Sequence, residues 1–164
     1  MKIINYESKY KDTLAEMFED FHNIMVSCDP SGMVKQFSKK EYVFKYVDKM
    51  INDSKKMNGF IFLAIVKNKP VGFVQGVIFD HKKDDMHKLV SKPGSQGWIG
   101  ELYVESLFRK QGIGKLLFDK AKEYFADNNC TTIRLNVFDG NKGAMKLYNE
   151  LGMMTRQHEM ELKL

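Results

Sequence analysis

Hydrophobic residues follow two periods in the first third of the chain. Residues 2–6 alternate apolar and polar side chains, which predicts a short strand, and residues 8–21 carry apolar side chains at helical spacing. Ser38 and Glu41 have the spacing of a capping box, in which each side chain bonds the backbone amide near the other. A second helix is therefore expected to start there and to present its apolar face over residues 42–51.

The middle of the chain is richer in strand patterns. Residues 60–66 and 71–79 are two apolar runs joined by a tight polar turn, which predicts an antiparallel hairpin. Residues 81–97 are polar and end in a stretch with proline and glycine, so a long exposed loop is expected there. Residues 98–104 are expected to form the next strand.

The last third alternates between helix and strand patterns. Apolar residues at helical spacing predict one helix over residues 112–125 and another over residues 141–151, with Gly152 suited to end the second. Residues 131–138 alternate like a strand, and the same alternation returns in residues 153–164.

These elements together indicate a fold class. The succession of strand, helix and strand from Trp98 to Val137 is a βαβ unit, whose crossover makes its two strands parallel, whereas the preceding hairpin is antiparallel. The pattern predicts an α/β protein with a mixed, mostly antiparallel twisted sheet flanked by helices. No repeat or linker interrupts the pattern, so residues 1–164 are expected to form a single domain.

Composition narrows the classes of function. Of the 164 residues, 43% are hydrophobic and 29% are charged, which is typical of a folded globular protein. Lysine and arginine outnumber the acidic residues by 26 to 21, but the lysines are spread along the whole chain, so a dedicated nucleic-acid surface is not indicated. No apolar run approaches the roughly 20 residues that a membrane-spanning helix needs.

Cysteine and histidine positions bear on redox state and metals. Cys28 and Cys130 lack CxxC spacing and no signal peptide precedes them, so we expect a reducing, cytoplasmic setting. The four histidines are too scattered for a metal-binding motif, and no metal site is expected.

A strand that runs into a glycine-containing turn and then a helix creates a site for an anion. The first amides of a helix have no partner within the helix and lie at the positive end of its dipole. Gly112 and Gly114 lack a Cβ, so a phosphate can approach the backbone closely. Arg109, Lys110 and Lys115 flank the turn and can add charged contacts. A pyrophosphate is the expected ligand, although a helix start without any ligand has the same spacing.

Two common phosphate-binding motifs are absent from this stretch. Gly114 is followed by Lys115 and two leucines rather than by the third glycine of a dinucleotide-binding fingerprint, and Arg134 stands where an acidic residue would be expected. A Walker A loop would need Ser or Thr at Leu116. Dinucleotide binding and nucleotide hydrolysis both lose support.

The same stretch resembles a known family. The pattern Arg/Gln-x-x-Gly-x-Gly/Ala of the acetyl-CoA-dependent N-acetyltransferases of the GNAT superfamily occurs here as RKQGIG in residues 109–114. Residues 101–104 look like the fourth strand of that family, while residues 135–138 and 141–153 look like its fifth strand and last helix. The resemblance extends from about Phe60 to the C-terminus, and before that only the order of elements agrees.

This resemblance implies acetyl-CoA as the co-substrate. The two parallel strands would splay apart, and the pantetheine arm of coenzyme A would lie in the opening, bonded to free backbone groups of Leu102, Tyr103 and Val104. An amide near Leu102 would polarise the thioester carbonyl, and Asn141 would contact the arm at the far wall. The pyrophosphate would be held by the turn and helix start, which comprise Arg109, Lys110, Gln111, Gly112, Ile113, Gly114 and Lys115.

Two catalytic residues are implied as well. An amine that attacks a thioester must lose a proton and the departing thiolate can gain one, so a base and an acid on opposite sides assist the reaction. Glu101 is the candidate base and Tyr148 the candidate acid. A water chain in place of Glu101 and a purely structural role for the Tyr148 ring stay open.

The acceptor implied by the resemblance is a primary amine of a small molecule or peptide, held by residues 21–37 and 80–97. Four carboxylates near the first of these segments could attract a cationic amine or simply form a solvated surface, namely Glu16, Glu19, Asp20 and Asp29. A monomer or homodimer is expected, with neither nucleic acid nor membrane as a partner.

Two other classes compete with an N-acetyltransferase. A non-catalytic acyl-CoA-binding or interaction module could share the fold. A nucleotide-dependent or nucleic-acid-binding protein is suggested by the net charge of +5, but the dispersed lysines and the absent phosphate motifs disfavour it.

Overall fold

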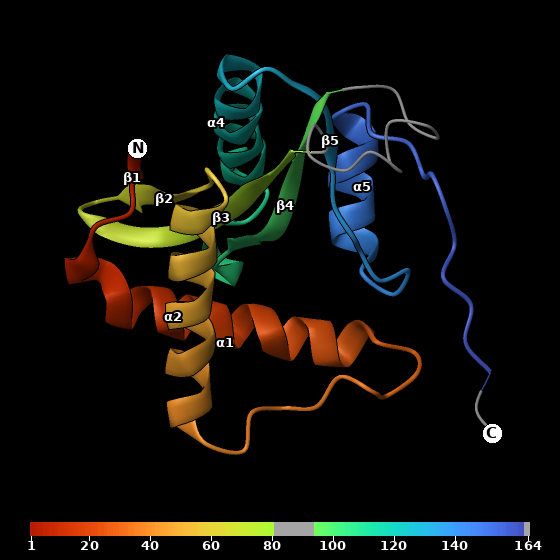
Figure 1. Ribbon diagram of the computed structural model, residues 1–164. Coiled ribbons are helices and arrows are strands. Elements are labelled where there is room, and N and C mark those ends of the chain that lie inside the picture. The colour runs from red at the N-terminus through yellow and green to blue at the C-terminus, as the bar shows by residue number, and fades with distance from the viewer. Residues whose placement is uncertain (81–93, 163–164) are drawn as a thin grey trace.

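The computed structural model describes residues 1–80 and 94–162. In chain order its elements are β1 (Lys2–Asn5), η1 (Ser8–Tyr10), α1 (Lys11–Cys28), α2 (Lys40–Lys56), β2 (Phe60–Val66), β3 (Lys69–Asp80), β4 (Ser95–Val104), η3 (Ser106–Phe108), α4 (Ile113–Asp127), β5 (Cys130–Arg134) and α5 (Lys142–Glu150). The strands form one sheet in the order β1-β2-β3-β4-β5. Helices α1 and α2 lie on one face of this sheet and α4 on the other (Figure 1).

The predicted fold class is confirmed. Strands β1 to β4 pair antiparallel in succession, and β4 pairs with β5 in parallel. Helix α4 connects these two parallel strands, as the βαβ pattern predicts. The result is a mixed, mostly antiparallel sheet with helices on both faces.

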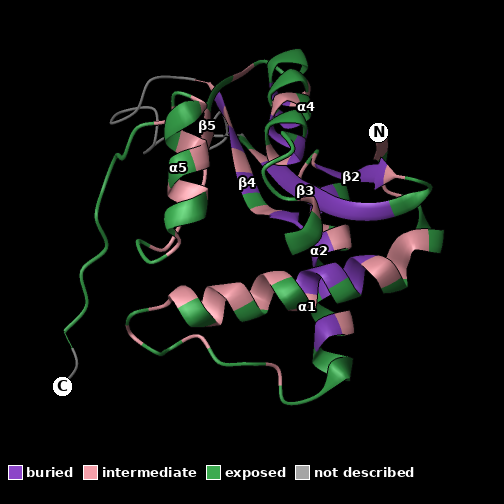
Figure 2. Cartoon of the chain, turned by 180° about the vertical axis from the view of Figure 1, so that it is seen from behind, coloured by how far each residue is buried: buried purple, intermediate pink, exposed green. Residues whose placement is uncertain are grey.

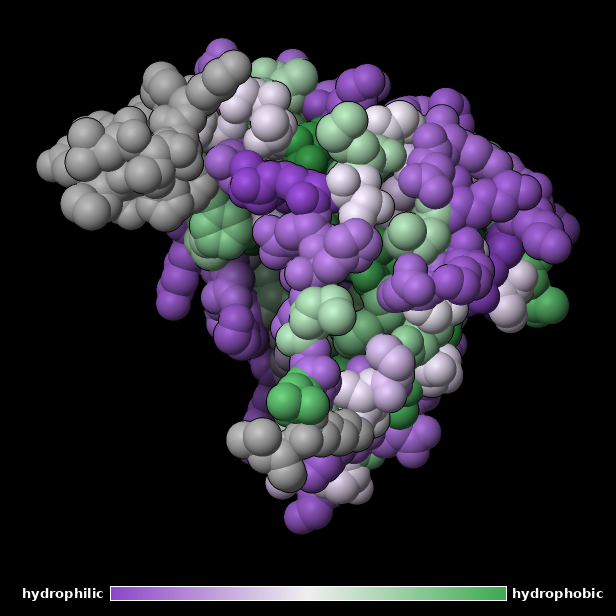
Figure 3. Space-filling model, turned by 90° about the vertical axis from the view of Figure 1, so that its right-hand side faces the viewer, coloured by the Kyte–Doolittle hydropathy of each residue, from purple (hydrophilic) through white to green (hydrophobic). Residues whose placement is uncertain are grey.

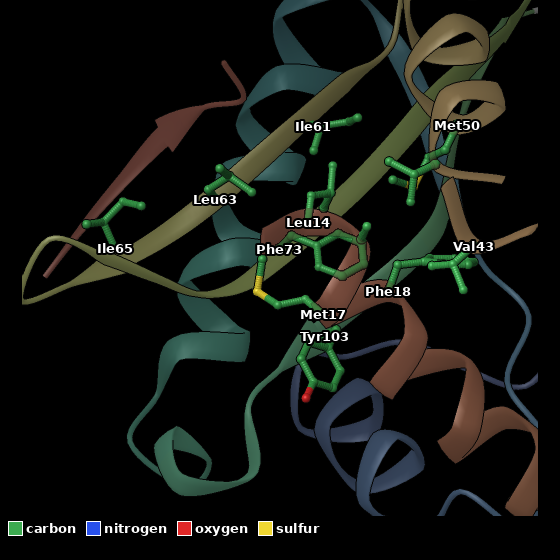
Figure 4. Close-up of a cluster of buried hydrophobic side chains, with 12 residues drawn as sticks. Leu14, Met17, Phe18, Val43, Met50, Ile61, Leu63, Ile65, Phe73 and Tyr103 are labelled. Carbon is green, nitrogen blue, oxygen red and sulfur yellow. The ribbon is translucent and has the colours of Figure 1, made fainter. Parts of the chain in front are cut away.

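Two apolar clusters hold the layers together, one on each face of the sheet. The buried residues of the strands and of α1, α2 and α4 are coloured purple in Figure 2. The cluster under α1 and α2 includes the buried side chains of Leu14, Phe18, Val47, Leu63 and Phe73, and part of it is drawn in Figure 4. The cluster under α4 includes Phe62, Val74, Ile99, Leu117 and Phe125. Because the central strands are covered on both faces, β2 is apolar at every position instead of alternating.

The predicted capping box before α2 is wrong. The helix begins at Lys40 with Lys39 as its N-cap, and no side chain bonds the first amides. Glu41 is therefore the second helical residue, one position too early for the reciprocal bond that a capping box needs. Its carboxylate pairs with Lys45 instead.

Part of the predicted loop over residues 81–97 is wrong as well. Strand β4 starts at Ser95 rather than Trp98, because β3 runs on to Asp80 and supplies a pairing partner opposite Ser95. Residues 81–93 of the predicted loop lie outside the described residues.

Two predicted strands at the C-terminal side are also corrected. Strand β5 ends at Arg134 rather than at residue 138, because its pairing with β4 ends at Trp98 and Arg134. The alternating pattern of residues 153–162 forms no strand in the described structure, and Met160 and Leu162 are 89% and 83% exposed. This segment runs away from the sheet in Figure 1. Figure 3 shows that side of the molecule, where hydrophobic and hydrophilic residues are mixed.

Candidate active site

An opening lies where β4 and β5 part. Strand β4 stays paired with β3 along its whole length, but its last pair with β5 joins Trp98 to Arg134. A bulge follows at once, since Gln75 is opposite Glu101 while Gly76 is opposite Ile99, which leaves Gly100 as the extra residue. A bulge bends and twists a strand, so residues 101–104 of β4 turn away from β5 (Figure 1).

The backbone groups of this open edge alternate in direction. The Glu105 amide donates to the Val71 carbonyl at 2.9 Å, and in an antiparallel pair every second residue faces the same neighbour, so the Tyr103 groups face β3 as well. Leu102 and Val104 consequently turn their backbone groups toward the opening. Of the three strand residues that the resemblance implies, the structure thus presents two to the opening and turns Tyr103 inward.

The Val104 carbonyl is already engaged. It accepts a hydrogen bond from Nε of Arg109 at 2.8 Å, and the guanidinium carbon lies 5.8 Å from the centre of the Tyr103 ring. The Tyr103 hydroxyl points away from the apolar cluster (Figure 4) and donates to Asp20 at 3.1 Å. Arg109 therefore folds back onto β4, which leaves the Leu102 groups and the Val104 amide as the polar groups along the opening.

Helix α4 begins beside this edge with unpaired amides. Its N-cap is Gly112, which adopts the left-handed region at φ 80°, and the first helical bond runs from the Leu116 amide to the Gly112 carbonyl. The amides of Ile113, Gly114 and Lys115 have no helical partner and point out of the helix start. Unpaired amides at a helix start are a general feature of anion-binding sites, and here they lie at the end of the open edge.

The two glycines at this helix start are required for different structural reasons. A Cβ on Gly112 would meet nothing within 4 Å, so this glycine is needed for its backbone conformation and for access to the amides. A Cβ on Gly114 would lie 3.2 Å from Cδ2 of Leu147. Gly114 thus lets α5 pack closely against α4, which the spacing of the motif alone does not reveal.

The other residues implied at the pyrophosphate lie around the same turn. Lys110 and Lys115 are exposed, and neither forms an ion pair within residues 1–80 and 94–162. Gln111 donates to the Leu107 carbonyl at 3.2 Å and so braces the turn. Ile113 is buried in the cluster under α4, which leaves only its amide for a ligand.

The last two residues implied by the resemblance are Tyr148 in α5 and Asn141 just before it. Tyr148 packs with Phe118 in the cluster under α4, and burial raises the pKa of its hydroxyl to about 12. The phenol therefore holds its proton throughout the neutral range. Asn141 is the N-cap of α5, and its side-chain oxygen accepts from the Ala144 amide at 3.1 Å, so only its amide nitrogen and backbone are left for a ligand.

Glu101 lies on the opposite face of the sheet from Tyr148. It lines a cavity of about 310 Å³ together with Tyr46, Lys49, Met50, Asp53, Met57, Gln75, Val77 and Phe79. Burial raises the pKa of the Glu101 carboxyl to about 7, an effect that the Lys49 ammonium opposes and the Asp53 carboxylate reinforces. Glu101 is thus partly ionised near neutral pH, and it is separated from Tyr148 by the open edge of β4.

The four carboxylates expected to attract an acceptor lie elsewhere. None of Glu16, Glu19, Asp20 and Asp29 lines the cavity. Asp29 accepts bonds from the Val34 amide at 2.8 Å and from Ser31, which lowers its pKa to about 2 and shapes the connection between α1 and α2. Within the part of the chain that the structure describes, no three His, Cys, Asp or Glu side chains gather into a metal site.

Sequence reasoning missed the α2 and β3 residues of the cavity. The signals were Gln75, a polar residue in an otherwise apolar run, and Lys49 with Asp53, spaced four apart on one side of α2. These signals point to a shared cavity only because α2 crosses the sheet next to Glu101, which the sequence does not show. Among the described residues, no helix has both the length and the apolar character to cross a membrane.

A mixed sheet with a splayed parallel pair, and a helix start with unpaired amides beside it, define the class of acyl-CoA-dependent N-acyltransferases. The model of the acetyltransferase (GNAT) family matches residues 16–153, and this chain belongs to that family. The chain is 41% identical over 59 residues to the thialysine N-epsilon-acetyltransferase of Bos taurus, a match that covers 36% of this chain and 35% of that protein. It spans about a third of the length of such curated relatives.

Solved structures agree with the fold. A mutant of the BH1408 protein from Bacillus halodurans superimposes with a TM-score of 0.83 at 18% identity, covering 100% of this chain and 99% of that chain. The aminoglycoside N-acetyltransferase AAC(6')-Iy in complex with CoA gives a TM-score of 0.72 at 12% identity, covering 99% and 93%. At these identities the likeness shows the fold alone.

Proposed function

We propose that this chain transfers the acetyl group of acetyl-CoA to a primary amine by direct attack in a ternary complex. The observation that carries the proposal is the open edge of β4, which has the unpaired amides of α4 at its end, Glu101 on one face and Tyr148 on the other. Family membership, a CoA complex of a structural neighbour and a relative named for acetylating an amine support the same reaction.

In this proposal, the helix start binds the pyrophosphate. The amides of Ile113, Gly114 and Lys115 donate to its oxygens, Lys110 and Lys115 add charge, and Arg109 and Gln111 hold the turn in shape. The pantetheine arm lies along Leu102 and Val104, with Asn141 on the other wall. Binding there adds a strand-like partner to an edge that has lost β5.

The acetyl transfer then requires one proton acceptor and one proton donor. Glu101 takes the proton of the ammonium or the attacking amine, while the Leu102 amide polarises the thioester carbonyl. A carbon–nitrogen bond forms and the carbon–sulfur bond breaks. Tyr148 gives its proton to the departing thiolate, and its raised pKa keeps that proton available.

The proposal is tested by measuring free thiol released from acetyl-CoA in the presence of primary amines, with the acetylated amine identified by mass spectrometry. Amine-dependent thiol release is the expected result. Acetyl-CoA binding detected by calorimetry without turnover of any amine would instead support the competing non-catalytic acyl-CoA-binding module.

A further inference from the structure

The cavity beside Glu101 lies between helix α2 and the paired strands β3 and β4. Helix α2 supplies Tyr46, Met50 and neighbouring residues, and β3 supplies Val77 and Phe79. Tyr46 is held in place because its ring stacks on Phe18 at 4.6 Å between ring centres. At about 310 Å³ the cavity is at the small end of ligand pockets, which run from roughly 300 to 1,000 Å³.

Its charges leave one carboxylate uncompensated. Lys49 and Asp53 lie one turn apart on α2 and form an ion pair with each other, so their charges cancel. The Glu101 side chain makes no hydrogen bond within residues 1–80 and 94–162, although its carboxyl lies in the wall of the cavity. One cation from a ligand would therefore balance the charge of this cavity.

Two further groups of the cavity wall are polar but uncharged, the Gln75 amide and the Tyr46 hydroxyl. Gln75 is buried, and its amide nitrogen donates to the Ser54 hydroxyl at 3.0 Å, which in turn donates to the Met50 carbonyl at 2.9 Å. The rest of the lining is thioether, aliphatic or aromatic, from Met50, Met57, Val77 and Phe79. A second positive charge on a ligand would lose water in this cavity without gaining an unpaired carboxylate as its partner.

We infer that the acceptor is a small primary monoamine with one ammonium group on an apolar stem, held with its nitrogen at Glu101 and its stem between Met50, Met57 and Phe79. This inference rests on the proposed acetyl transfer and names its substrate class. Glu101 and Leu102 are consecutive on β4, so a nitrogen at the Glu101 carboxyl approaches the opening from the face of α2. Polycationic acceptors such as aminoglycosides do not match this charge balance.

The test compares two amines of the same length. n-Heptylamine and 1,6-diaminohexane differ only in whether the far end is a methyl or an ammonium group. The wild-type protein should acetylate n-heptylamine with a kcat/KM at least about tenfold higher, because the second ammonium costs on the order of 1.4 kcal/mol or more among apolar walls. Kanamycin serves as the polycationic comparison and should be a still poorer acceptor.

A charge variant tests whether the cavity itself sets this preference. Lys49→Gln leaves Asp53 without its partner, so the diamine should improve relative to the monoamine by about threefold to tenfold. The ratio of the two kcat/KM values cancels any effect of this change on the base itself. Lys45→Gln is the matched control, since it breaks the Glu41–Lys45 pair on the same helix away from the cavity and should leave the ratio unchanged.

Three outcomes would overturn the inference. A preference for the diamine or for kanamycin in the wild-type protein contradicts the monoamine class while leaving the acetyl transfer intact. Equal ratios in the Lys49→Gln and Lys45→Gln variants remove the cavity as the source of specificity. Absence of thiol release with every amine, in a protein that binds acetyl-CoA, overturns the proposed function and this inference together.

Discussion

At the scale of single residues, burial has opposite consequences for Tyr148 and Glu101. It strengthens the hold of Tyr148 on its proton, with a pKa of about 12, and it brings the pKa of Glu101 to about 7. The first keeps the phenol protonated at neutral pH, so that it can hydrogen-bond the departing thiolate, and the second is suited to exchanging a proton with an amine near neutral pH. Each property can be tested by removing one functional group.

Tyr148→Phe removes the hydroxyl and keeps the ring against Phe118. We expect kcat to fall roughly 100-fold, the low end for general acid catalysis because a thiolate is a good leaving group, with acetyl-CoA affinity nearly unchanged. Steady-state kinetics measures kcat, and calorimetry measures the affinity for acetyl-CoA. Tyr124→Phe is the control, since that hydroxyl bonds the Gly59 carbonyl remote from the opening. Equal losses in both variants would make the Tyr148 hydroxyl a structural group.

The pH dependence of the reaction reports on Glu101. A base with a pKa of about 7 is protonated below that value, so kcat/KM should rise about tenfold per pH unit from pH 5 to 6 and level off above pH 8. Glu101→Gln should lower the rate and abolish this rise. Glu105→Gln changes a carboxylate that directly follows β4 and does not line the cavity, so this variant should keep the rise. A rise that persists in Glu101→Gln would assign the base to another group, such as a water chain.

At the scale of elements, the start of α4 depends on one backbone conformation. Gly112→Asn and Gly112→Asp place side chains of equal size at φ 80°, where both residue types are tolerated and nothing lies within 4 Å of the new Cβ. The aspartate alone adds a negative charge beside the amides that would hold the pyrophosphate. We expect it to bind acetyl-CoA roughly 100-fold more weakly than the asparagine variant, or about 2.8 kcal/mol.

Calorimetry with acetyl-CoA measures this difference, and circular dichroism shows whether both variants fold alike. Similar affinities for the aspartate and asparagine variants would place the pyrophosphate elsewhere.

Elements were predictable where burial imposed the pattern. The helical spacing in residues 8–21 and the apolar run of β2 follow from packing against the two clusters, and both elements formed. The capping box before α2 failed because its two side chains needed an N-cap one residue earlier than the chain adopts. The predicted ends of strands were wrong where the length of the partner strand sets the end, as at Ser95 and Arg134.

At the scale of the whole molecule, folding raises the pKa of Glu101, and the stability of the protein therefore depends on pH. The folded pKa is about 7 and the ordinary value is 4.5, so the folded state binds more protons between these values. Stability contributed by the neutral carboxyl is complete below about pH 4.5 and is lost as the pH rises through 7. The charged form of Glu101 thus destabilises the folded protein at alkaline pH.

Glu101→Gln should remove that cost. Because the carboxyl keeps some contact with solvent through the cavity, we expect the variant to gain about 1–2 kcal/mol in the free energy of unfolding at pH 8 relative to wild type, and much less at pH 4.5. Urea unfolding at the two pH values measures it. An equal gain in the free energy of unfolding at both pH values would show that packing of the amide, not removal of the charge, is responsible.

The sequence by itself determined the fold class, the βαβ order and the glycine-containing helix start in residues 109–114, because periodicity and missing Cβ atoms are local properties of the chain. The tertiary structure decided which backbone groups of Leu102, Tyr103 and Val104 face the opening, since that depends on pairing with β3. It also decided that Glu101 shares a cavity with Tyr46, Lys49 and Asp53, residues about 50 positions away along the chain, because only the crossing of α2 over the sheet brings them together.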